Sequence, residues 1–228
     1  MTQIAPNRLV VFDCDGTLVD SQHAIVEAMK SAFRHNALTE PPAEATRRTV
    51  GLSLSDAVGR LLPADAQDKL DDIVAHYKEA AYILRQQSEH EEPLYPGVTK
   101  VLESLLSKGY QLGVATGKSS RGLEATLEYH GLRDHFNILK TAEDGPGKPN
   151  PDILWDAMAE MGAAPETTIM IGDTTFDIVM AVRARVPAIG VAWGYHAPEE
   201  LVAAGAVHIA EAFTELPSII CGLWKRTS

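Results

Sequence analysis

The sequence predicts an α/β fold in which a doubly wound parallel sheet of the Rossmann-like kind carries an inserted α-helical cap domain. Short apolar segments rich in β-branched residues recur along the chain, and amphipathic helical patterns separate most of them. A third observation predicts the cap: between about residues 21 and 88, helical patterns follow one another without a convincing strand.

The predicted strands are short and apolar on nearly every residue. Such strands are covered on both faces, as in a parallel sheet between two layers of helices. In that architecture ligands bind beyond the carboxyl ends of the strands. The predicted strands are Leu9 to Phe12, Leu112 to Ala115, Ile138 to Lys140, Thr168 to Ile171 and Ala188 to Ala192.

Two amphipathic helices of the core are clear from their apolar stripes. One stripe runs from Val98 to Leu106 and stops before Gly109, a suitable residue for a helix end. The other follows Asn150 and Pro151, a plausible N-cap and first-turn pair, and ends at Gly162. Helices between parallel strands imply right-handed crossovers.

The cap is predicted from stripes that include Ile25 to Phe33 and Leu70 to Tyr77. We therefore expect a core formed by residues 1–19 and 93–228 and a cap formed by residues 20–92. The flanks Val19-Asp20 and Glu89 to Pro93 are polar or contain proline, so they are candidate hinges.

Composition excludes several classes of function. The chain has 228 residues, 45% of them hydrophobic, no apolar run long enough to span a bilayer, and a net charge of −11 that disfavours nucleic acid. Two distant cysteines suit a reducing compartment, and no signal peptide is recognisable, so we expect a cytoplasmic protein. A small anionic substrate stays possible, because a metal ion and lysines can reverse the field inside a cleft.

Asp13 and Asp15 directly follow the first predicted strand. Two carboxylates so placed can point into one cleft, where one attacks or binds metal and the other moves protons. The alternative is a hairpin in which Asp15-Gly16 is only a tight turn, but the alternating flanks of a hairpin are missing.

Three further motifs follow along the chain. Thr116-Gly117-Lys118, after the second predicted strand, could bind phosphoryl oxygens or only begin a helix. Lys148, before a proline, could neutralise carboxylates or be a solvated loop lysine. Asp173 and Asp177 share one helix face and suit Mg²⁺, although acids also favour helix N-termini.

Taken together and in this order, the four motifs resemble those of the haloacid dehalogenase superfamily, in particular its phosphatases with a helical cap after the first strand. The resemblance covers essentially the whole chain. Within the family, phosphoglycolate phosphatases are the most similar group, as the segment Val191 to Tyr195 also suggests. Gly117 departs from the asparagine usual in that group.

The resemblance implies a role for each motif residue. Asp13 would be the nucleophile and a Mg²⁺ ligand, and Asp15 the general acid/base and a metal ligand through its backbone carbonyl. Asp173 would be a direct ligand, with Asp177 in the outer shell of the metal. Lys148 would hold nucleophile and phosphoryl group together. The substrate-binding residues would be Thr116, Gly117 and Lys118.

The implied function is Mg²⁺-dependent hydrolysis of a small phosphomonoester, with 2-phosphoglycolate as a candidate, through a phosphoaspartyl intermediate. The second aspartate argues against dehalogenation, and Leu54 stands where related phosphonate hydrolases and sugar phosphomutases carry a basic residue. Arg47 and Arg48 are further candidates for substrate contacts. A pyrophosphatase or nucleotidase, and a noncatalytic protein that binds a phosphorylated metabolite, are the alternatives.

Overall fold

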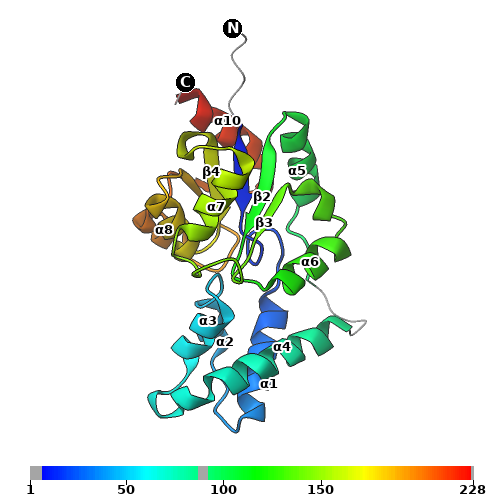
Figure 1. Cartoon of the computed structure of the whole chain (residues 1–228), viewed down its shortest axis with the longest axis vertical. Coiled ribbons are helices and arrows are strands. Elements are labelled where there is room, and N and C mark those ends of the chain that lie inside the picture. The colour runs from blue at the N-terminus through cyan, green and yellow to red at the C-terminus, as the bar shows by residue number, and fades with distance from the viewer. Residues whose placement is uncertain (1–6, 87–91, 227–228) are drawn as a thin grey trace.

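The computed structural model describes residues 7–86 and 92–226. Its centre is a parallel sheet with the strand order β3-β2-β1-β4-β5-β6 (Figure 1). The strands are β1 (Leu9–Phe12), β2 (Gln111–Ala115), β3 (Ile138–Lys140), β4 (Thr168–Gly172), β5 (Ala188–Val191) and β6 (His208–Ala210).

All five predicted strands are confirmed to within one residue at each end, and one strand was missed. β6 has three residues, of which His208 is exposed and Ala210 alone is buried. An edge strand this short and this polar does not produce the apolar pattern of a buried strand. The hairpin alternative for Asp15-Gly16 is wrong, because β1 pairs in parallel with both of its neighbours.

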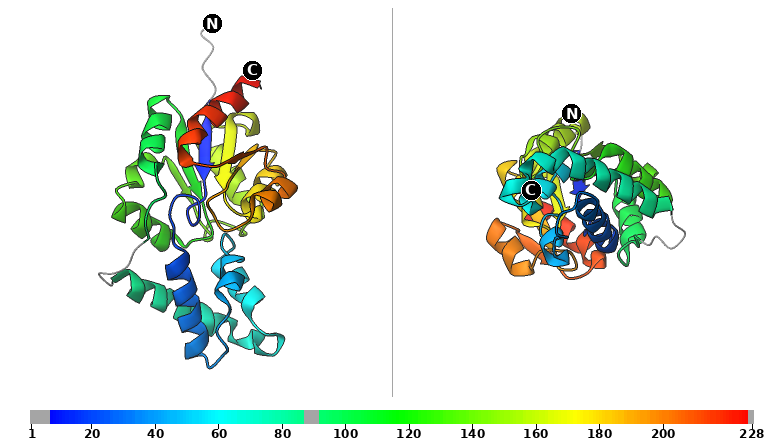
Figure 2. Two further views of the ribbon diagram at one scale, coloured as in Figure 1. Left: turned by 180° about the vertical axis from the view of Figure 1, so that it is seen from behind. Right: turned by 90° about the horizontal axis from the view of Figure 1, so that it is seen from below.

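The sheet has a hydrophobic cluster on each face because successive residues of a strand point to opposite sides. Val10 and Phe12 belong to one cluster, and Leu9 and Val11 to the other. Figure 2 gives two further views of the helices around the sheet, one from behind and one from below. The first cluster includes residues of α5 (Val98–Ser107), α6 (Ser120–Tyr129) and α10 (Leu216–Arg226), and the second those of α7 (Asp152–Met161), α8 (Thr175–Arg183) and α9 (Pro198–Ala204).

The two predicted core helices are present. α5 ends two residues before Gly109, as expected. The side chain of Asn150 accepts a hydrogen bond from the backbone N–H of Asp152 at 3.1 Å, so it caps α7 from one position earlier than a regular N-cap, and Gly162 ends that helix. Short 3₁₀ helices complete the chain at Ala64–Lys69, Arg133–His135, Pro165–Thr167 and Phe213–Glu215.

Between β1 and α5 the described residues form helices and no strand. These helices are α1 (Gln22–His35), α2 (Ala43–Arg47), α3 (Leu54–Leu61) and α4 (Leu70–Gln86). Of these, α1, α3 and α4 enclose a hydrophobic cluster of their own, which includes Met29, Phe33, Val58 and Ile73. In Figure 1 the four helices lie beyond the end of the sheet where the strands β1 and β2 finish. This is the region in which doubly wound folds bind ligands.

The two connections to this helical unit run beside each other. Val19 forms an antiparallel bridge with Leu94, and the N–H of Asp20 donates to the carbonyl of Pro93 at 2.9 Å. Most of the predicted hinge from Glu89 to Pro93 lies in residues 87–91, outside the described residues. Across the described helices, none combines the length and the apolar character needed to cross a membrane.

The helical unit should depend on Ile73 for stability. This side chain is fully buried in the cluster that α1, α3 and α4 enclose, so Ile73→Ala should lower the free energy of unfolding by about 2–5 kcal/mol. Ile83→Ala, on the same helix but 51% exposed, is the matched control and should change it by less than about 0.5 kcal/mol. Urea unfolding measures both, and equal effects would contradict the packing described.

Candidate functional site

The loop after β1 turns tightly at the carboxyl edge of the sheet. The N–H of Asp13 donates to the carbonyl of Ile171 at 2.9 Å, which continues the pairing of β1 with β4. The chain then turns at Gly16, whose φ of +84° is in the left-handed region. A Cβ at this position would lie 2.2 Å from Oδ2 of Asp173, so glycine is required for both its backbone angle and its size.

Lys148 is the central cation of this edge. Its side chain is fully buried, and Nζ lies 2.8 Å from Oδ1 of Asp13 and 2.5 Å from Oδ1 of Asp177. The reading of Lys148 as a solvated loop lysine is therefore wrong. An ammonium this deep in the protein is stable only beside carboxylates that offset its loss of hydration.

Asp177 combines a structural role with its contact to Lys148. Its Oδ2 accepts hydrogen bonds from the N–H of Thr174 at 3.0 Å and from the Thr174 hydroxyl at 2.7 Å, so it closes a capping box at the start of α8. Both of its oxygens are therefore engaged. Asp177 is therefore an acid at the start of a helix, as one interpretation of the sequence held. It also lies close to Asp13 and Asp173.

Asp173 faces Asp13 from the end of β4. Its Oδ1 accepts a hydrogen bond from the Thr17 hydroxyl, and its Oδ2 accepts one from the N–H of Tyr195, each at 2.9 Å. Carboxylate oxygens keep further lone pairs after one such bond. Both oxygens of Asp173 are thus fixed in position and still able to bind a cation.

Burial is the main influence on the pKa values of Asp13 and Asp173 in this site. Burial raises the pKa of Asp13 to about 7, against the opposing effect of Lys148. Burial and the charges of Asp13 and Asp177 raise the pKa of Asp173 well above its ordinary value. Burial alone would lower the pKa of Lys148, but its two carboxylate partners outweigh this effect and raise it.

A divalent cation fits between these acids. Oxygens of Asp13, Asp173 and Asp177 lie within 4.8 Å of one another, and Oδ2 of Asp13 is buried without a hydrogen-bond partner among the described residues. Since Asp177 is already engaged, Asp13 and Asp173 are the side chains best able to hold the ion. Hard oxygen ligands of this kind suit Mg²⁺.

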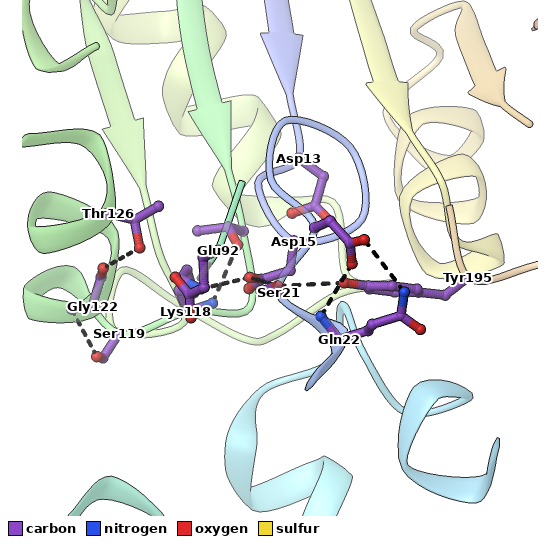
Figure 3. Close-up of polar contacts among 12 residues, drawn as sticks. Asp13, Asp15, Ser21, Gln22, Glu92, Lys118, Ser119, Gly122, Thr126 and Tyr195 are labelled. Carbon is purple, nitrogen blue, oxygen red and sulfur yellow. Dashed lines mark hydrogen bonds and ion pairs between the residues drawn. The ribbon is translucent and has the colours of Figure 1, made fainter. Parts of the chain in front are cut away.

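Asp15 lies apart from this acidic cluster. Its Oδ1 accepts hydrogen bonds from the Ser21 hydroxyl and from Nζ of Lys118, the latter at 2.5 Å. Figure 3 shows Lys118 approaching Asp15 from the β2 side and Tyr195 from the opposite side. The Tyr195 hydroxyl lies 3.3 Å from Oγ of Ser21. The Asp15 side chain is therefore held outside the acidic cluster, so a metal ligand from this residue would have to be its backbone carbonyl, as the sequence analysis expected.

The loop after β2 brings the second motif to the same cleft. Thr116 is buried, and its Oγ1 accepts a weak hydrogen bond from the N–H of Lys118 at 3.3 Å. Gly117 lies directly beneath the cap: a Cβ there would be 2.2 Å from the carbonyl oxygen of Leu52 and 2.8 Å from that of Gly51. Glycine at this position therefore lets the cap backbone approach the core.

A cavity of about 500 Å³ opens onto these residues. Asp13, Asp15 and Thr116 line it from the core, and side chains of α1, α3 and α4 line it from the cap. Gly117 and Lys118 also line it, whereas the other predicted site residues are buried and join the site through Asp13. These are Lys148, Asp173 and Asp177.

The two candidate arginines lie elsewhere. Arg47 pairs with Glu44 at 3.0 Å on the exposed face of α2. Arg48 forms two hydrogen bonds with Glu200 of the core, at 2.6 and 2.7 Å, which hold the pKa of Glu200 at about 2. Neither arginine lines the cavity. Arg48 instead joins cap to core.

Sequence reasoning missed the supporting residues Thr17, Ser21 and Tyr195. Tyr195 lay in a segment that the family resemblance had already singled out, but its backbone contact with Asp173 carries no sequence signal. Thr17 belongs to the first motif, and its hydroxyl, two residues after Asp15, could have been predicted to donate a hydrogen bond to a nearby carboxylate. Ser21 reaches Asp15 only because the loop turns back.

The fold and the buried acids define a hydrolase-type site at the carboxyl edge of a doubly wound sheet, and comparison with known proteins agrees. The model of the family "Haloacid dehalogenase-like hydrolase" matches residues 10–191. The chain therefore belongs to this family, and the resemblance seen in the four motifs is confirmed.

Several relatives of similar length carry phosphatase names. The chain is 37% identical over 223 residues to "Probable phosphatase IndB" of Dickeya dadantii, covering 96% of each chain. It is 29% identical over 218 residues to a phosphoglycolate phosphatase of Vibrio parahaemolyticus, covering 93% of this chain and 96% of the relative. The crystal structure of a predicted phosphatase from Clostridium acetobutylicum superposes with a TM-score of 0.84 at 25% identity, covering 96% of this chain and all of that one.

Mg²⁺ should stabilise the folded protein through Asp173. Above the pKa of Asp13 this carboxyl is ionised, and the site without metal is short of positive charge. At pH 8, Mg²⁺ at 100 times its Kd should therefore add about 2.7 kcal/mol to the free energy of unfolding and raise the melting temperature by several degrees. Below about pH 6, protons compete for Asp13 and the gain should shrink.

Asp173→Asn should abolish this gain, whereas Asp156→Asn, an exposed change of equal charge on α7, should keep it. Thermal unfolding followed by circular dichroism measures the shift. An undiminished Mg²⁺ effect in Asp173→Asn would remove this residue from the metal site.

Gly117→Ala should displace the cap. The added Cβ meets backbone oxygen rather than a flexible side chain, so the loop at residues 51–52 has to move, and we expect kcat/KM to fall about tenfold or more. Gly59→Ala in α3 is the control, because its Cβ would have no neighbour within 4 Å. That variant should keep full activity and gain about 0.5–1 kcal/mol of stability. Wild-type kinetics in Gly117→Ala would contradict the close approach.

Proposed function

We propose that this protein is a Mg²⁺-dependent phosphatase that hydrolyses a small phosphomonoester through a phosphoaspartyl intermediate on Asp13. The observation that carries the proposal is the group of three buried carboxylates that includes Asp13, which pairs with buried Lys148 and lines a cavity together with Asp15. Membership of a hydrolase family and the phosphatase names of its relatives support the same reaction class.

In the first step, a carboxylate oxygen of Asp13 attacks phosphorus and the ester P–O bond breaks. The proton that the leaving alkoxide needs comes from Asp15. This requires Asp15 to be protonated when the substrate is bound, although it accepts a hydrogen bond from Lys118 in the free protein. General acid catalysis of this kind contributes roughly 10²–10⁴-fold to the rate.

In the second step, a water molecule attacks the phosphoaspartate. Asp15 takes a proton from that water, the acyl phosphate bond breaks, and inorganic phosphate and free Asp13 are released. Asp15 serves both steps from one position because Ser21 and Lys118 hold its side chain beside the cavity.

The other residues supply charge and orientation. Lys148 offsets the negative charge that gathers when the carboxylate of Asp13 meets a phosphoryl group. The Thr116 hydroxyl, with the Gly117-Lys118 segment, would donate to phosphoryl oxygens. The residues that would hold Mg²⁺ are Asp13, Asp173 and the backbone carbonyl of Asp15, with Asp177 in the outer shell. When bound, the ion would neutralise charge on the phosphoryl oxygens.

The division of labour between two units is part of the proposal. Residues 1–19 and 93–228 would form the core that performs the chemistry, and residues 20–92 the cap that covers the leaving group. Cap side chains on one wall of the cavity and the close contact of Leu52 with Gly117 support this division. A closed cap excludes bulk water from the reacting groups.

Candidate substrates are small phosphorylated metabolites, and phosphoglycolate is among them because relatives carry that activity in their names. Phosphate release from a panel that also contains pyrophosphate and nucleotides, with Mg²⁺ and with EDTA, tests the class. Preference for pyrophosphate or nucleotides would indicate the alternative hydrolases of this fold. A folded protein that binds these compounds without turnover would indicate a regulatory role.

Asp13→Asn should abolish phosphate release while leaving the fold intact, because an amide does not attack phosphorus. Asp15→Asn should lower kcat by roughly 10²–10⁴-fold. Asp156→Asn, exposed on α7, is the control and should retain full activity.

Acid-quenched protein should carry one added phosphoryl group by intact mass spectrometry during turnover, and Asp15→Asn should accumulate more of it if hydrolysis of the intermediate slows most. A well-folded Asp13→Asn variant that still turns over would remove Asp13 as the nucleophile.

A further inference from the structure

The cavity above Asp13 and Asp15 differs in character between its two ends. At the core end it contains the catalytic acids and the segment Thr116-Gly117-Lys118. At the cap end the lining is dominated by apolar and aromatic side chains from α1, α3 and α4, namely Ile25, Met29, Leu54, Val74 and Tyr77. Ile25, Leu54, Val74 and Tyr77 are only partly buried, so part of their apolar surface faces open space.

The size of the cavity exceeds what a two-carbon acid fills. On a scale of about 30 Å³ for each water-sized group, glycolate occupies on the order of 150 Å³. A volume of about 500 Å³ has room for a phosphoryl group and an organic group roughly twice as large as glycolate. Sites of 300–1,000 Å³ with mainly apolar lining are typical of ligands that carry rings or comparable apolar bodies.

Four cations among the described residues line the cavity, Lys118 and Arg121 from the core and Lys78 and Arg85 from α4, of which Lys78 is exposed and Arg85 partly buried. Lys118, the last residue of the phosphoryl-binding segment, already donates to Asp15 at 2.5 Å. Arg121 is exposed at the rim, where its guanidinium lies 4.9 Å from the ring centre of Tyr82. A substrate carboxylate at the core end would have to take Lys118 from Asp15, whereas an apolar group would cover the partly exposed side chains of α1 and α4 without disturbing that ion pair.

We propose that the substrate is a phosphomonoester of an alcohol with an apolar, ring-sized body, which packs against Ile25, Val74 and Tyr77. This inference rests on the proposed phosphatase function and narrows its substrate class. The phosphoryl group would lie at Asp13, and the ring would extend between α1 and α4. The leaving group would thus be selected by the shape and apolarity of the cap.

Four phosphate esters of primary alcohols test the inference with similar leaving groups. Benzyl phosphate carries an apolar ring, glucose 6-phosphate a polar ring, and ethyl phosphate and phosphoglycolate no ring. Wild-type protein with Mg²⁺ should hydrolyse benzyl phosphate with a kcat/KM at least tenfold above that of the other three. A preference for phosphoglycolate, ethyl phosphate or the sugar ester would overturn the inference and leave the phosphatase function standing.

Filling the cavity tests where the ring lies. Val74→Trp should lower kcat/KM for benzyl phosphate at least tenfold, mainly through KM, and change that for ethyl phosphate by less than threefold. Ala75→Trp, one residue further on the exposed face of α4, should change neither. Ile25→Trp narrows the cavity from α1 and replaces Val74→Trp if that variant does not fold.

Equal losses for both esters in the filling variants would overturn the placement of the ring between α1 and α4. If a folded, Mg²⁺-loaded protein releases phosphate from none of the esters or of the wider panel, the phosphatase function itself fails, and the inference with it. The wild-type comparison of esters is decisive whether or not the variants fold.

Discussion

The contact of Lys148 with Asp13 and Asp177 is the interaction on which the site depends. These three side chains come from the ends of different core segments, and all three are fully buried. Removing one partner from such a group leaves a buried charge uncompensated, which typically costs about 3–5 kcal/mol. The ion pairs therefore hold the loop after β1 and the start of α8 in one arrangement.

That arrangement also explains why the acids are useful for chemistry. Among the described residues Lys148 is the one ammonium in contact with the group formed by Asp13, Asp173 and Asp177, which leaves an excess of negative charge when all three acids are ionised. Burial is the main cause that raises the pKa values of Asp13 and Asp173, and the neighbouring acids add to it. A divalent cation would remove that excess and keep Asp13 ionised. Asp15 is held separately by Lys118, so the two acids of the first motif have different environments although one residue separates them.

The cap reaches the core through close backbone contacts as well as side chains. Leu52 approaches Gly117, Arg48 pairs with Glu200, and the guanidinium of Arg60 lies 5.1 Å from the ring centre of Phe176. The exposed ion pair adds little stability by itself. Together these contacts place the apolar side chains of α1 and α4 on the same cavity as Asp13 and Asp15. Under the proposed function, the core would perform the chemistry and the cap would select the leaving group.

The sequence by itself determined five of the six described strands, two of the core helices, the helical insertion after β1, and the four motifs that meet at the carboxyl edge. It could do so because buried parallel strands are apolar throughout and because functional residues of this fold follow strand ends directly. The edge strand β6 was not predicted, because three residues, of which one is buried, are too few to show a hydrophobic pattern.

Only the tertiary structure decided how the motif residues divide among roles. That Lys118 pairs with Asp15, that Arg48 joins Glu200, and that Gly117 lies beneath Leu52 all depend on contacts between residues far apart in the chain. The same is true of the cavity, whose size and apolar wall arise where α1 and α4 face the core. Local patterns record which residues are buried in an element, but not which distant surface each one meets.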